Sequence, residues 1–294
     1  MTPLSTEVVR RESSFRASDG LRLVSRSWRA AGERAARGRV VLVHGFGEHS
    51  GRYDEMAAWL VDRGFAVDAY DHRGHGLSEG HRNFVPRARG FDAYVDDLMT
   101  FLALLAGERE EAARILVGHS MGGLVVARAL ARRGPDVACA VISGAALAVS
   151  PGFSRTKQWL ARALAVVAPR LALESGLPVA GLSRDPEVVR RYEADPLVCT
   201  RMTAGLAAAM LRAQIETACE GSRVRVPLLG LHGADDPICP AQGTERFLRD
   251  VATPRSAFKA YAGLRHEIFN EPERVAVWED VVAFAAGDGE EGRA

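Results

Sequence analysis

Short runs of apolar residues alternate with amphipathic stretches along most of this chain. Residues 39–43 are apolar after the first position, which is typical of a strand buried on both faces. Residues 92–105 instead place Tyr94, Leu98 and Phe101 on one side, as a helix packed on a core does. This alternation predicts an α/β protein with a mostly parallel sheet and helices on both faces.

The pattern predicts eight strands and, outside one interrupted region, five helices. The first two strands flank Asp19-Gly20, a dipeptide typical of a hairpin turn. The predicted strands cover residues 14–18, 21–28, 39–43 and 65–70, the run that begins at Arg114, and residues 138–143, 226–232 and 256–261. The predicted helices cover residues 53–62, 92–105, 124–130, 241–251 and 272–286. The polar end of the chain, residues 287–294, is expected to fray.

The alternation stops between residues 147 and 221, where no strand is visible and three helices are predicted. These helices cover residues 157–167, 186–192 and 203–218. The segment follows the sixth strand, and ligands of open α/β sheets bind at the carboxyl ends of the strands. We therefore expect a core of residues 1–146 and 222–294, with residues 147–221 as a helical cap, or lid, over the substrate site.

The composition is that of an ordinary globular protein and excludes some partners. Of its 294 residues, 26% are charged and 47% hydrophobic, with a net charge of +1, so no nucleic-acid partner is expected. The four cysteines have neither Cys-x-x-Cys spacing nor a compact disulfide framework, as in proteins of a reducing compartment. No signal peptide is visible, nor an apolar run of the roughly 18 to 20 residues that span a bilayer. We expect a cytoplasmic protein whose contact with a membrane is at most peripheral.

Gly118-His-Ser120-Met-Gly122 follows an apolar run and precedes residues of high helix propensity. A Gly-x-Ser-x-Gly at a strand-to-helix junction is typical of a nucleophile elbow, a sharp turn that exposes a serine hydroxyl above a sheet. The two glycines leave room for the strand and the helix to pass closely. A glycine-rich turn with a helix-capping serine has the same local sequence. Ser120 is therefore a candidate nucleophile whose partners must be found elsewhere.

A serine nucleophile requires a base and a carboxylate that orients the base. In hydrolases with this elbow, the acid and the histidine follow the serine in that order, after later strands. Asp236 and His266 follow the last two predicted strands, so they are the candidate acid and base. Taken alone, Asp235 or Asp236 could cap a helix that begins near Pro240, and His266 could be a surface histidine.

Other histidines near predicted strand ends fit the role of base less well. His119 adjoins Ser120, and the tight turn should aim its side chain elsewhere. His44 and His232 each precede a glycine, and we expect them to pack or to hydrogen-bond locally.

The developing charge on a substrate carbonyl needs preorganised N–H donors. One is expected from Met121, the residue after the serine, and the other from the loop after strand 39–43. In that loop, His44-Gly-Phe-Gly47 points to the backbone N–H of Phe46. A glycine-rich turn needed only for chain reversal is the alternative.

His72-x-x-His75 beside Asp71 raises the question of a metal site. The loop is glycine-rich and no further cluster of ligands is near it in the sequence, so a hydrogen-bonded structural loop is the better interpretation. We expect no metal and no organic cofactor.

Several blocks between residues 15 and 285 resemble the monoacylglycerol lipase branch of the serine α/β-hydrolases. The blocks are His44-Gly-Phe-Gly-Glu-His-Ser-Gly-Arg-Tyr53, Asp71-His-Arg-Gly-His-Gly-Leu-Ser-Glu-Gly80, Gly118-His-Ser-Met-Gly-Gly123, Leu182-Ser-Arg184, Tyr192-Glu-Ala-Asp-Pro-Leu197, His266 and Asn270-Glu-Pro-Glu273. The resemblance implies an α/β-hydrolase fold, with a mostly parallel eight-stranded sheet, helices on both faces and a helical cap insertion. It also implies Ser120, Asp236 and His266 as a catalytic triad, with Phe46 and Met121 as oxyanion donors.

The resemblance further implies a lipid ester as substrate and hydrolysis of monoacylglycerols to a fatty acid and glycerol. Lysophospholipase or short- to medium-chain carboxylesterase activity on the same scaffold is the alternative, and a non-catalytic binding protein of this fold is a distant one. Glu48, Arg52 and Tyr192 match positions near the glycerol end of the family's pocket. Cys239 matches a pocket-lining cysteine, or is an inert buried thiol.

The resemblance also implies a cap with an apolar face near lipid. Leu160, Leu164, Val167 and Leu171 are spaced along one helical face, which either meets a membrane or packs on the core. Phe46 departs from the family, because mammalian members have a small residue there. Its ring is expected to narrow the pocket and so to affect the preferred acyl chain.

Overall fold

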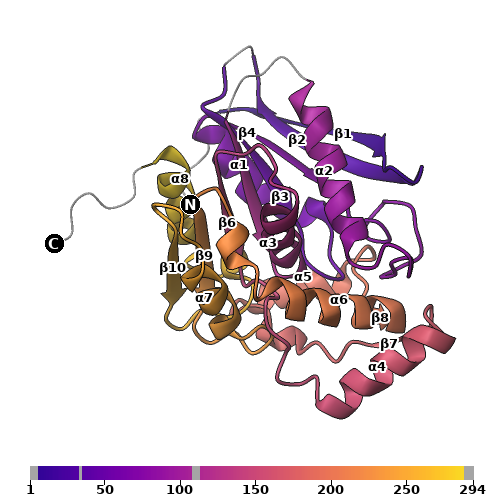
Figure 1. Cartoon of the computed structure of the whole chain (residues 1–294). Helices are drawn as coiled ribbons and strands as arrows, with labels where there is room; N and C mark the ends of the chain where they lie inside the picture. Colours follow the sequence, from indigo (N-terminus) through magenta and orange to yellow (C-terminus); the bar gives the residue numbers. More distant parts are fainter. Residues whose placement is uncertain (1–5, 33–34, 108–112, 288–294) are drawn as a thin grey trace.

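An eight-stranded sheet forms the centre of the computed structural model, which describes residues 6–32, 35–107 and 113–287 (Figure 1). The strand order is β1-β2-β4-β3-β5-β6-β9-β10, and the pairs β1–β2 and β2–β4 are antiparallel. The other pairs are parallel, which confirms the predicted mostly parallel sheet. The strands are β1 Val8–Arg16, β2 Arg22–Ala30, β3 Gly38–Val43, β4 Phe65–Tyr70, β5 Arg114–His119, β6 Cys139–Ser143, β9 Leu228–Gly233 and β10 Ala257–Tyr261.

The N-terminal hairpin is longer than its sequence pattern predicts. β1 pairs with β2 from Val8 opposite Ala30 to Arg16 opposite Arg22. The turn lies at Asp19-Gly20 as predicted, with Gly20 at a positive φ of 89°. The first half of β1 escaped prediction because its side chains are exposed, so they need not alternate between apolar and polar types.

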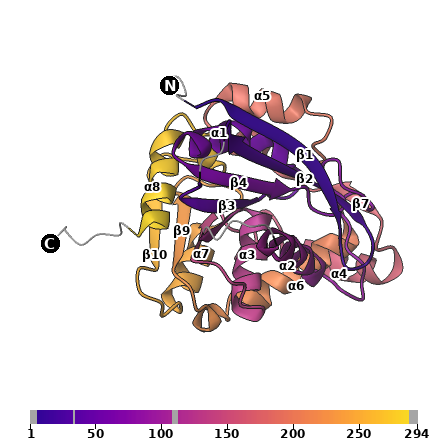
Figure 2. The ribbon, with the colours of Figure 1, turned by 90° about the horizontal axis from the view of Figure 1, so that it is seen from above.

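Helices cover both faces of the sheet, and each layer has its own hydrophobic core (Figure 2). On one face, α2, α3 and α7 bury residues that include Leu98, Leu124 and Phe247. On the other face, α1 and α8 pack Trp59 against Trp278, with ring centroids 5.5 Å apart. The bounds are close to those predicted: α1 Asp54–Asp62, α2 Asp92–Ala106, α3 Met121–Arg132, α7 Ala241–Arg249 and α8 Arg274–Ala286.

The segment between β6 and β9 contains three further α-helices and a second, two-stranded sheet. The helices α4 Arg155–Val167, α5 Pro186–Ala194 and α6 Ala204–Thr217 agree with the predicted ones. The strands β7 Ala172–Glu174 and β8 Arg201–Thr203 pair antiparallel, so the expectation that this segment contains no strand is wrong. With three residues each, they are too short to produce a recognisable alternation. Single-turn 3₁₀ helices are η1 Ser50–Tyr53, η2 Val179–Gly181, η3 Gly221–Arg223 and η4 Ile268–Asn270.

The inserted segment borders loops that follow the carboxyl ends of the central strands. The backbone N–H of Cys199 donates to the carbonyl of Gly47 at 2.8 Å, in the loop after β3. The backbone N–H of His266, in the loop after β10, donates to the carbonyl of Gly181 at 3.3 Å. The segment therefore lies at the edge of the sheet where open α/β folds bind ligands.

Two sequence-based expectations concern the ends and the membrane. Residues 287–294, expected to fray, lie outside the described residues except for Gly287. Across the three described ranges, none of the helices combines the length and the apolar character needed to cross a bilayer.

Candidate active site

Ser120 lies alone between the end of β5 and the start of α3. Its backbone has φ 53° and ψ −116°, a conformation that residues other than glycine rarely adopt. A Cβ on Gly122 would overlap the carbonyl oxygen of Val43, and a Cβ on Gly118 would lie 2.6 Å from the carbonyl oxygen of Gly122. The two glycines are therefore sterically required, as expected for a nucleophile elbow.

The structure brings Ser120, His266 and Asp236 into one hydrogen-bonded chain. His266 Nε2 lies 3.0 Å from Ser120 Oγ, and His266 Nδ1 lies 2.7 Å from Asp236 Oδ2. Asp236 is in the loop after β9 and His266 in the loop after β10. A neutral His266 with its proton on Nδ1 donates to Asp236 and accepts from the serine hydroxyl. This arrangement can move the serine proton to the imidazole while the hydroxyl oxygen attacks a carbonyl carbon.

The Asp236 carboxylate is buried and accepts four hydrogen bonds. Oδ1 accepts from the backbone N–H groups of Ile238 at 2.8 Å and Cys239 at 3.0 Å, and Oδ2 accepts from His266 and from His232 Nε2 at 3.0 Å. Burial would raise the pKa of this carboxyl, but the charge of His266 and the hydrogen bonds outweigh burial and hold the pKa well below its usual range. Asp236 therefore stays ionised beside the imidazole.

The helix-capping alternative for Asp235 and Asp236 does not apply. The N-cap of α7 is Pro240, and that position has no side-chain hydrogen bond. Asp235 is exposed, and the backbone groups that bond to Asp236 lie in the loop before the helix. The carboxylate of Asp236 thus belongs to the loop and faces His266.

His232 hydrogen-bonds locally, as predicted, but its partner is the candidate acid, which sequence reasoning did not anticipate. Its Nε2 also lies 2.9 Å from the carbonyl oxygen of Cys239. The sequence signal for this contact is that His232, near the end of β9, precedes Asp236 by four residues. The Cys239 thiol is buried, and burial raises its pKa well above the ordinary value, so it is present as the neutral thiol.

His266 packs against the ring of His119, with centroids 4.8 Å apart. Burial disfavours the protonated form of His266, but the Asp236 carboxylate and its hydrogen bond outweigh burial and raise the pKa above 6.5. Burial and the neighbouring His266 lower the pKa of His119 to about 3, so this second ring is neutral. His119 Nδ1 lies 3.3 Å from Ser143 Oγ, so the ring hydrogen-bonds away from Ser120 and forms one wall for His266.

The candidate oxyanion donors are the backbone N–H groups of Phe46 and Met121. A Cβ on Gly45 would lie 3.1 Å from Ser120 Cβ, so the loop after β3 passes beside the candidate nucleophile. Glu48 Oε1 accepts the N–H of Gly45 at 2.6 Å and holds this loop. The N–H of Phe46 donates to no acceptor in the described part of the chain, and Met121 opens α3, where first-turn N–H groups are free. Both groups are therefore available to a ligand.

Glu48 and Arg52 form a buried ion cluster with Glu267, which the sequence pattern did not single out. Arg52 Nη1 donates to Glu48 Oε2 and Glu267 Oε1, both at 2.7 Å, and Nη2 donates to Glu267 Oε2 at 2.8 Å. Burial raises the pKa of Glu48, whereas the charge and hydrogen bonds of Arg52 overcome burial and lower the pKa of Glu267 to about 2. The charged groups of Glu48 and Arg52 are thus bonded to each other and to neighbouring protein groups.

Tyr192 differs from these two residues, although all three were expected near the glycerol end of the pocket. Its ring lies under the Arg52 guanidinium, 4.8 Å from ring centroid to Cζ. Its buried hydroxyl has no hydrogen-bond partner among the described residues. An unsatisfied buried hydroxyl is unfavourable, so this group is suited to bond to a ligand.

The His72-x-x-His75 loop is held by packing and hydrogen bonds. Asp71 Oδ1 accepts from Arg26 Nη1 at 2.6 Å, and His44 Nε2 accepts the backbone N–H of His72 at 2.8 Å. The rings of His44 and His72 pack at an interplanar angle of 55°, with centroids 4.3 Å apart. Over residues 6–32, 35–107 and 113–287, no group of three His, Cys, Asp or Glu residues could hold a metal ion. Through His72, this loop bonds to and packs against His44 in the loop that carries Phe46.

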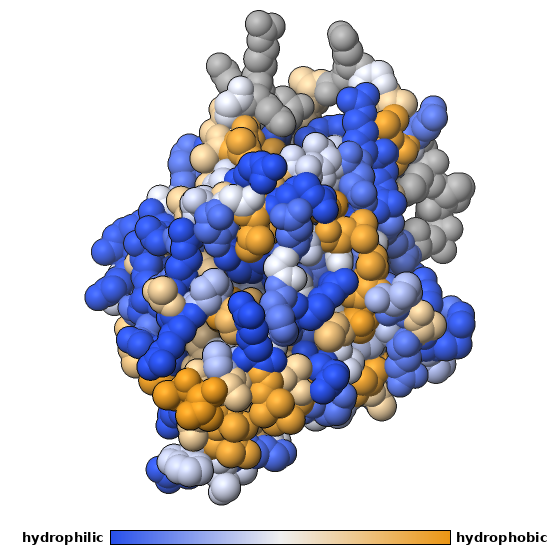
Figure 3. Space-filling view, turned by 90° about the vertical axis from the view of Figure 1, so that its right-hand side faces the viewer, coloured by the Kyte–Doolittle hydropathy of each residue, from blue (hydrophilic) through white to orange (hydrophobic). Residues whose placement is uncertain are grey.

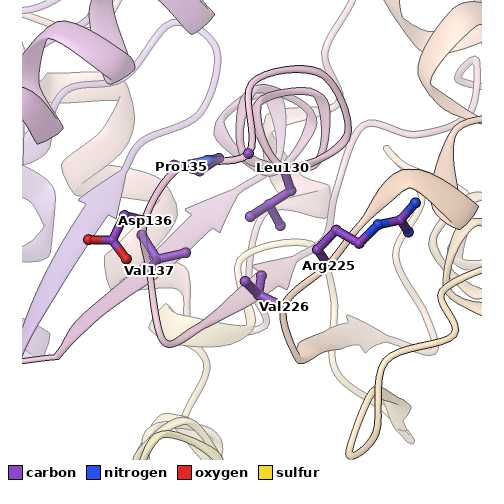
Figure 4. A pocket seen from close by; sticks show the side chains of 7 residues that line it. Leu130, Pro135, Asp136, Val137, Arg225 and Val226 are labelled. Carbon is purple, nitrogen blue, oxygen red and sulfur yellow. The ribbon is translucent and has the colours of Figure 1, made fainter.

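A shallow pocket lies near the amino ends of β6 and β9, whereas Ser120 follows the carboxyl end of β5 (Figure 4). Its lining residues are Leu130, Gly134, Pro135, Asp136, Val137, Arg225 and Val226. The acidic side chain among them, Asp136, forms a surface ion pair with Arg114. This lining contains neither a nucleophile nor a histidine, so the pocket is not a candidate active site.

Comparison with known proteins gives consistent matches over nearly the whole chain. Residues 34–273 match the family described as "Serine aminopeptidase, S33". A monoacylglycerol lipase of Mycolicibacterium smegmatis is 37% identical over 276 residues, 94% of this chain and 96% of the relative. Phospholipase YtpA of Bacillus subtilis is 29% identical over 252 residues, 83% of this chain and 93% of the relative. The crystal structure of Paleococcus ferrophilus monoacylglycerol lipase matches with a TM-score of 0.78 at 32% identity, covering 94% of this chain and 99% of that one.

Proposed function

Because the chain belongs to the serine aminopeptidase S33 family and has the α/β-hydrolase fold, we propose that it cleaves monoacylglycerols to a fatty acid and glycerol. The observation that carries the proposal is the hydrogen-bonded chain of Ser120, His266 and Asp236 at a strained strand-to-helix turn. The family description names a peptidase, so the choice of a lipid ester rests on relatives, two of which are named monoacylglycerol lipase.

In the first step, Ser120 Oγ attacks the ester carbonyl carbon while His266 Nε2 takes the hydroxyl proton. The N–H groups of Phe46 and Met121 donate to the oxyanion of the tetrahedral intermediate, and each such donor contributes about 10² to 10³ in rate. The intermediate breaks its carbon–oxygen bond to the glycerol moiety, which leaves with the proton from His266. Asp236 stabilises the imidazolium that exists between the two proton transfers.

The second step releases the fatty acid from the acyl-enzyme. His266 removes a proton from a water molecule, whose oxygen attacks the acyl carbon through the same oxyanion site. Collapse of this intermediate breaks the bond to Ser120 Oγ, and His266 returns the proton to the serine. Water is the only co-reactant in this sequence.

A second candidate function is hydrolysis of lysophospholipids, favoured by the similarity to Phospholipase YtpA. The charges beside the oxyanion loop favour a neutral head group instead. Arg52 is one cation against two carboxylates, Glu48 and Glu267, so the cluster does not attract a phosphate. The unpartnered hydroxyl of Tyr192 can bond to a glycerol hydroxyl. We therefore rank monoacylglycerol above lysophospholipid.

We also propose that residues 147–221 form a cap over a core of residues 1–146 and 222–294, and that the cap meets lipid peripherally. Exposed hydrophobic side chains gather on the surface of residues 147–221, on α4 and in the segment that follows it (Figure 3). They are Trp159, Leu160, Val166, Val167, Leu171 and Leu173. Val167 is 79% exposed and Trp159 67% exposed.

The alternative, in which the apolar face of α4 packs on the core, does not account for these exposures. The one residue of α4 that is buried is Ala161; Leu164 is half-buried, and Leu171 lies beyond the end of the helix. Exposed Arg155 and Lys157 on the same helix suit an anionic lipid surface. The four cysteines are free, as in a reducing compartment, and we assign the protein to the cytoplasm.

The proposal is tested with a panel of substrates that share one acyl chain: a monoacylglycerol, a lysophospholipid and a simple alkyl ester. We expect the highest kcat/KM for the monoacylglycerol, and a fall in kcat of at least about 10⁴-fold in Ser120→Ala and in His266→Ala, because loss of either group removes proton-coupled attack.

Circular dichroism and thermal unfolding serve as the folding control for both variants. Near-normal turnover in either folded variant would contradict the assignment of the triad. A higher kcat/KM for the lysophospholipid would favour the second candidate function.

A further inference from the structure

We propose that Glu271 is a positioning residue that holds the loop of His266 against cap residues 180–184. This part of the cap then helps to position His266 for catalysis. The inference rests on the proposed function, since it concerns the placement of His266 relative to Ser120.

The His266 loop contacts the cap through three consecutive residues. Two of the contacts are backbone hydrogen bonds, and the arginine side chain makes two more. They are His266 N to Gly181 O (3.3 Å), Glu267 N to Leu182 O (2.7 Å), and Arg265 Nη1 to Ala180 O (2.6 Å) and Ser183 O (3.2 Å). The loop after β10 is therefore bonded to the cap on both sides of the candidate base.

Glu271 is fully buried and joins the two segments through one carboxylate. Oε1 accepts the backbone N–H of Arg265 at 2.7 Å, directly before His266. Oε2 accepts Ser183 Oγ at 3.1 Å and the backbone N–H of Arg184 at 3.0 Å, both in the cap. Arg184 Nε lies 3.4 Å from the same oxygen. Because a buried carboxylate is costly unless it is paired and hydrogen-bonded, it is satisfied only while both segments keep their positions.

The same cap residues also touch the loop of the candidate acid. A Cβ on Gly181 would collide with the ring of Pro237, which adjoins Asp236. Residues 180–184 are thus wedged between the acid loop and the histidine loop. A shift of this segment would move His266 relative to Ser120, and a misplacement of about 1 Å can lower a rate by about 10²-fold.

The test compares Glu271→Gln with Glu273→Gln as the matched control. Glu273 also pairs with Arg184, but its side chain is 52% exposed. On a soluble short-chain ester, we expect Glu271→Gln to lower kcat by about 10- to 100-fold with KM changed less than about twofold, because His266 is displaced while substrate contacts remain. The far-downfield proton resonance of the hydrogen bond between His266 Nδ1 and Asp236 should shift in Glu271→Gln and persist in Glu273→Gln.

An unchanged kcat and resonance in Glu271→Gln would overturn the inference, as would equal losses in both variants. If Glu271→Gln does not fold, Ser183→Ala carries the test, because it removes one donor to the same carboxylate. A lower kcat with a shifted resonance in folded Ser183→Ala supports the inference, and unchanged values overturn it. A wild-type protein without ester hydrolysis would refute the proposed function itself, which separates the two failures.

Discussion

Asp236 determines how His266 behaves, because the two side chains share a hydrogen bond in a buried site. In the proposed mechanism, the carboxylate keeps the imidazole turned with Nε2 toward Ser120 and stabilises the positive charge that the ring acquires during attack. His232 and two backbone N–H groups hold the carboxylate in turn. His232 therefore affects the site by holding the Asp236 carboxylate and not by contact with the substrate.

The pH dependence of hydrolysis should reflect the pKa of His266 beside Asp236. His266 accepts a proton only when it is neutral, and its pKa is raised above 6.5 by Asp236 against the opposing effect of burial. We expect kcat/KM to fall as the pH decreases through this raised pKa, so the acid limb lies above pH 6.5.

The variant Asp236→Asn tests whether Asp236 raises the pKa of His266. The variant removes the charge that favours the imidazolium, so its remaining activity should have an acid limb at lower pH than the wild type. The pH–rate profile of both proteins on a soluble ester measures this. An acid limb that does not move in the variant would contradict the assignment of His266 as the base.

The elbow is a property of β5 and α3 together, since neither element alone places Ser120 at its strained φ and ψ. β5 lies between β3 and β6 in the sheet, which fixes the end of the strand. In the second half of α3, Arg128 bonds to Asp92 in α2 and to Glu216 and Thr217 in α6. The nucleophile turn is thus clamped from both sides by elements distant in sequence.

Gly122→Ala should disrupt this turn. The added Cβ would overlap the carbonyl oxygen of Val43, a backbone atom of the neighbouring strand that cannot move away cheaply. We expect a loss of more than about 4 kcal/mol in the free energy of unfolding, or a folded protein without ester hydrolysis. Gly152→Ala is the control, because its Cβ would meet only Ser150 Oγ at 4.0 Å, and we expect it to change stability by less than about 0.5 kcal/mol. A stable, active Gly122→Ala protein would rule out the elbow geometry.

In the whole molecule, the cap has one part that is bonded to the core and one that is largely exposed. Residues 180–184 bond to the His266 loop, and α6 bonds to α3 through Arg128. α4, in contrast, buries only Ala161. We propose that the bonded part positions the candidate catalytic residues and that α4 meets the lipid surface that carries the substrate.

Replacing Trp159 and Val167 together with Gln should weaken the action of the protein on lipid surfaces. Burying each side chain in a bilayer interface contributes on the order of 1 kcal/mol or more, so we expect binding to anionic vesicles to fall by at least about tenfold. Hydrolysis of a monoacylglycerol in those vesicles should fall with it, while kcat/KM for a soluble ester stays near the wild-type value. Co-sedimentation and a turnover assay measure the two effects.

Leu104→Gln is the control for the cap variant, because this residue is half exposed on α2, away from the cap. It should leave vesicle binding unchanged. Equal loss of binding in the Leu104 variant, or full vesicle binding by the cap variant, would refute a specific role for the cap face.

The sequence by itself determined the sheet, most of the helices and the candidate triad. Buried strands need continuous apolar runs and helices need an apolar face, so both elements leave a periodic signal. The elbow is visible in the sequence because the turn requires glycine two residues before and two residues after Ser120. Asp236 and His266 could be chosen because the chain order of the fold assigns them to the loops after the last two strands.

Only the tertiary structure decided which polar side chains bond to one another around the candidate triad. Glu267 meets Arg52 across 215 positions of sequence, and Glu271 meets Ser183 across 88. β7 and β8 are likewise visible only as a pair. Such contacts leave no periodic signal, since a single buried carboxylate looks in sequence like any surface glutamate. Their partners are set by how the cap and the loops fold onto one another, and burial then makes each bond obligatory.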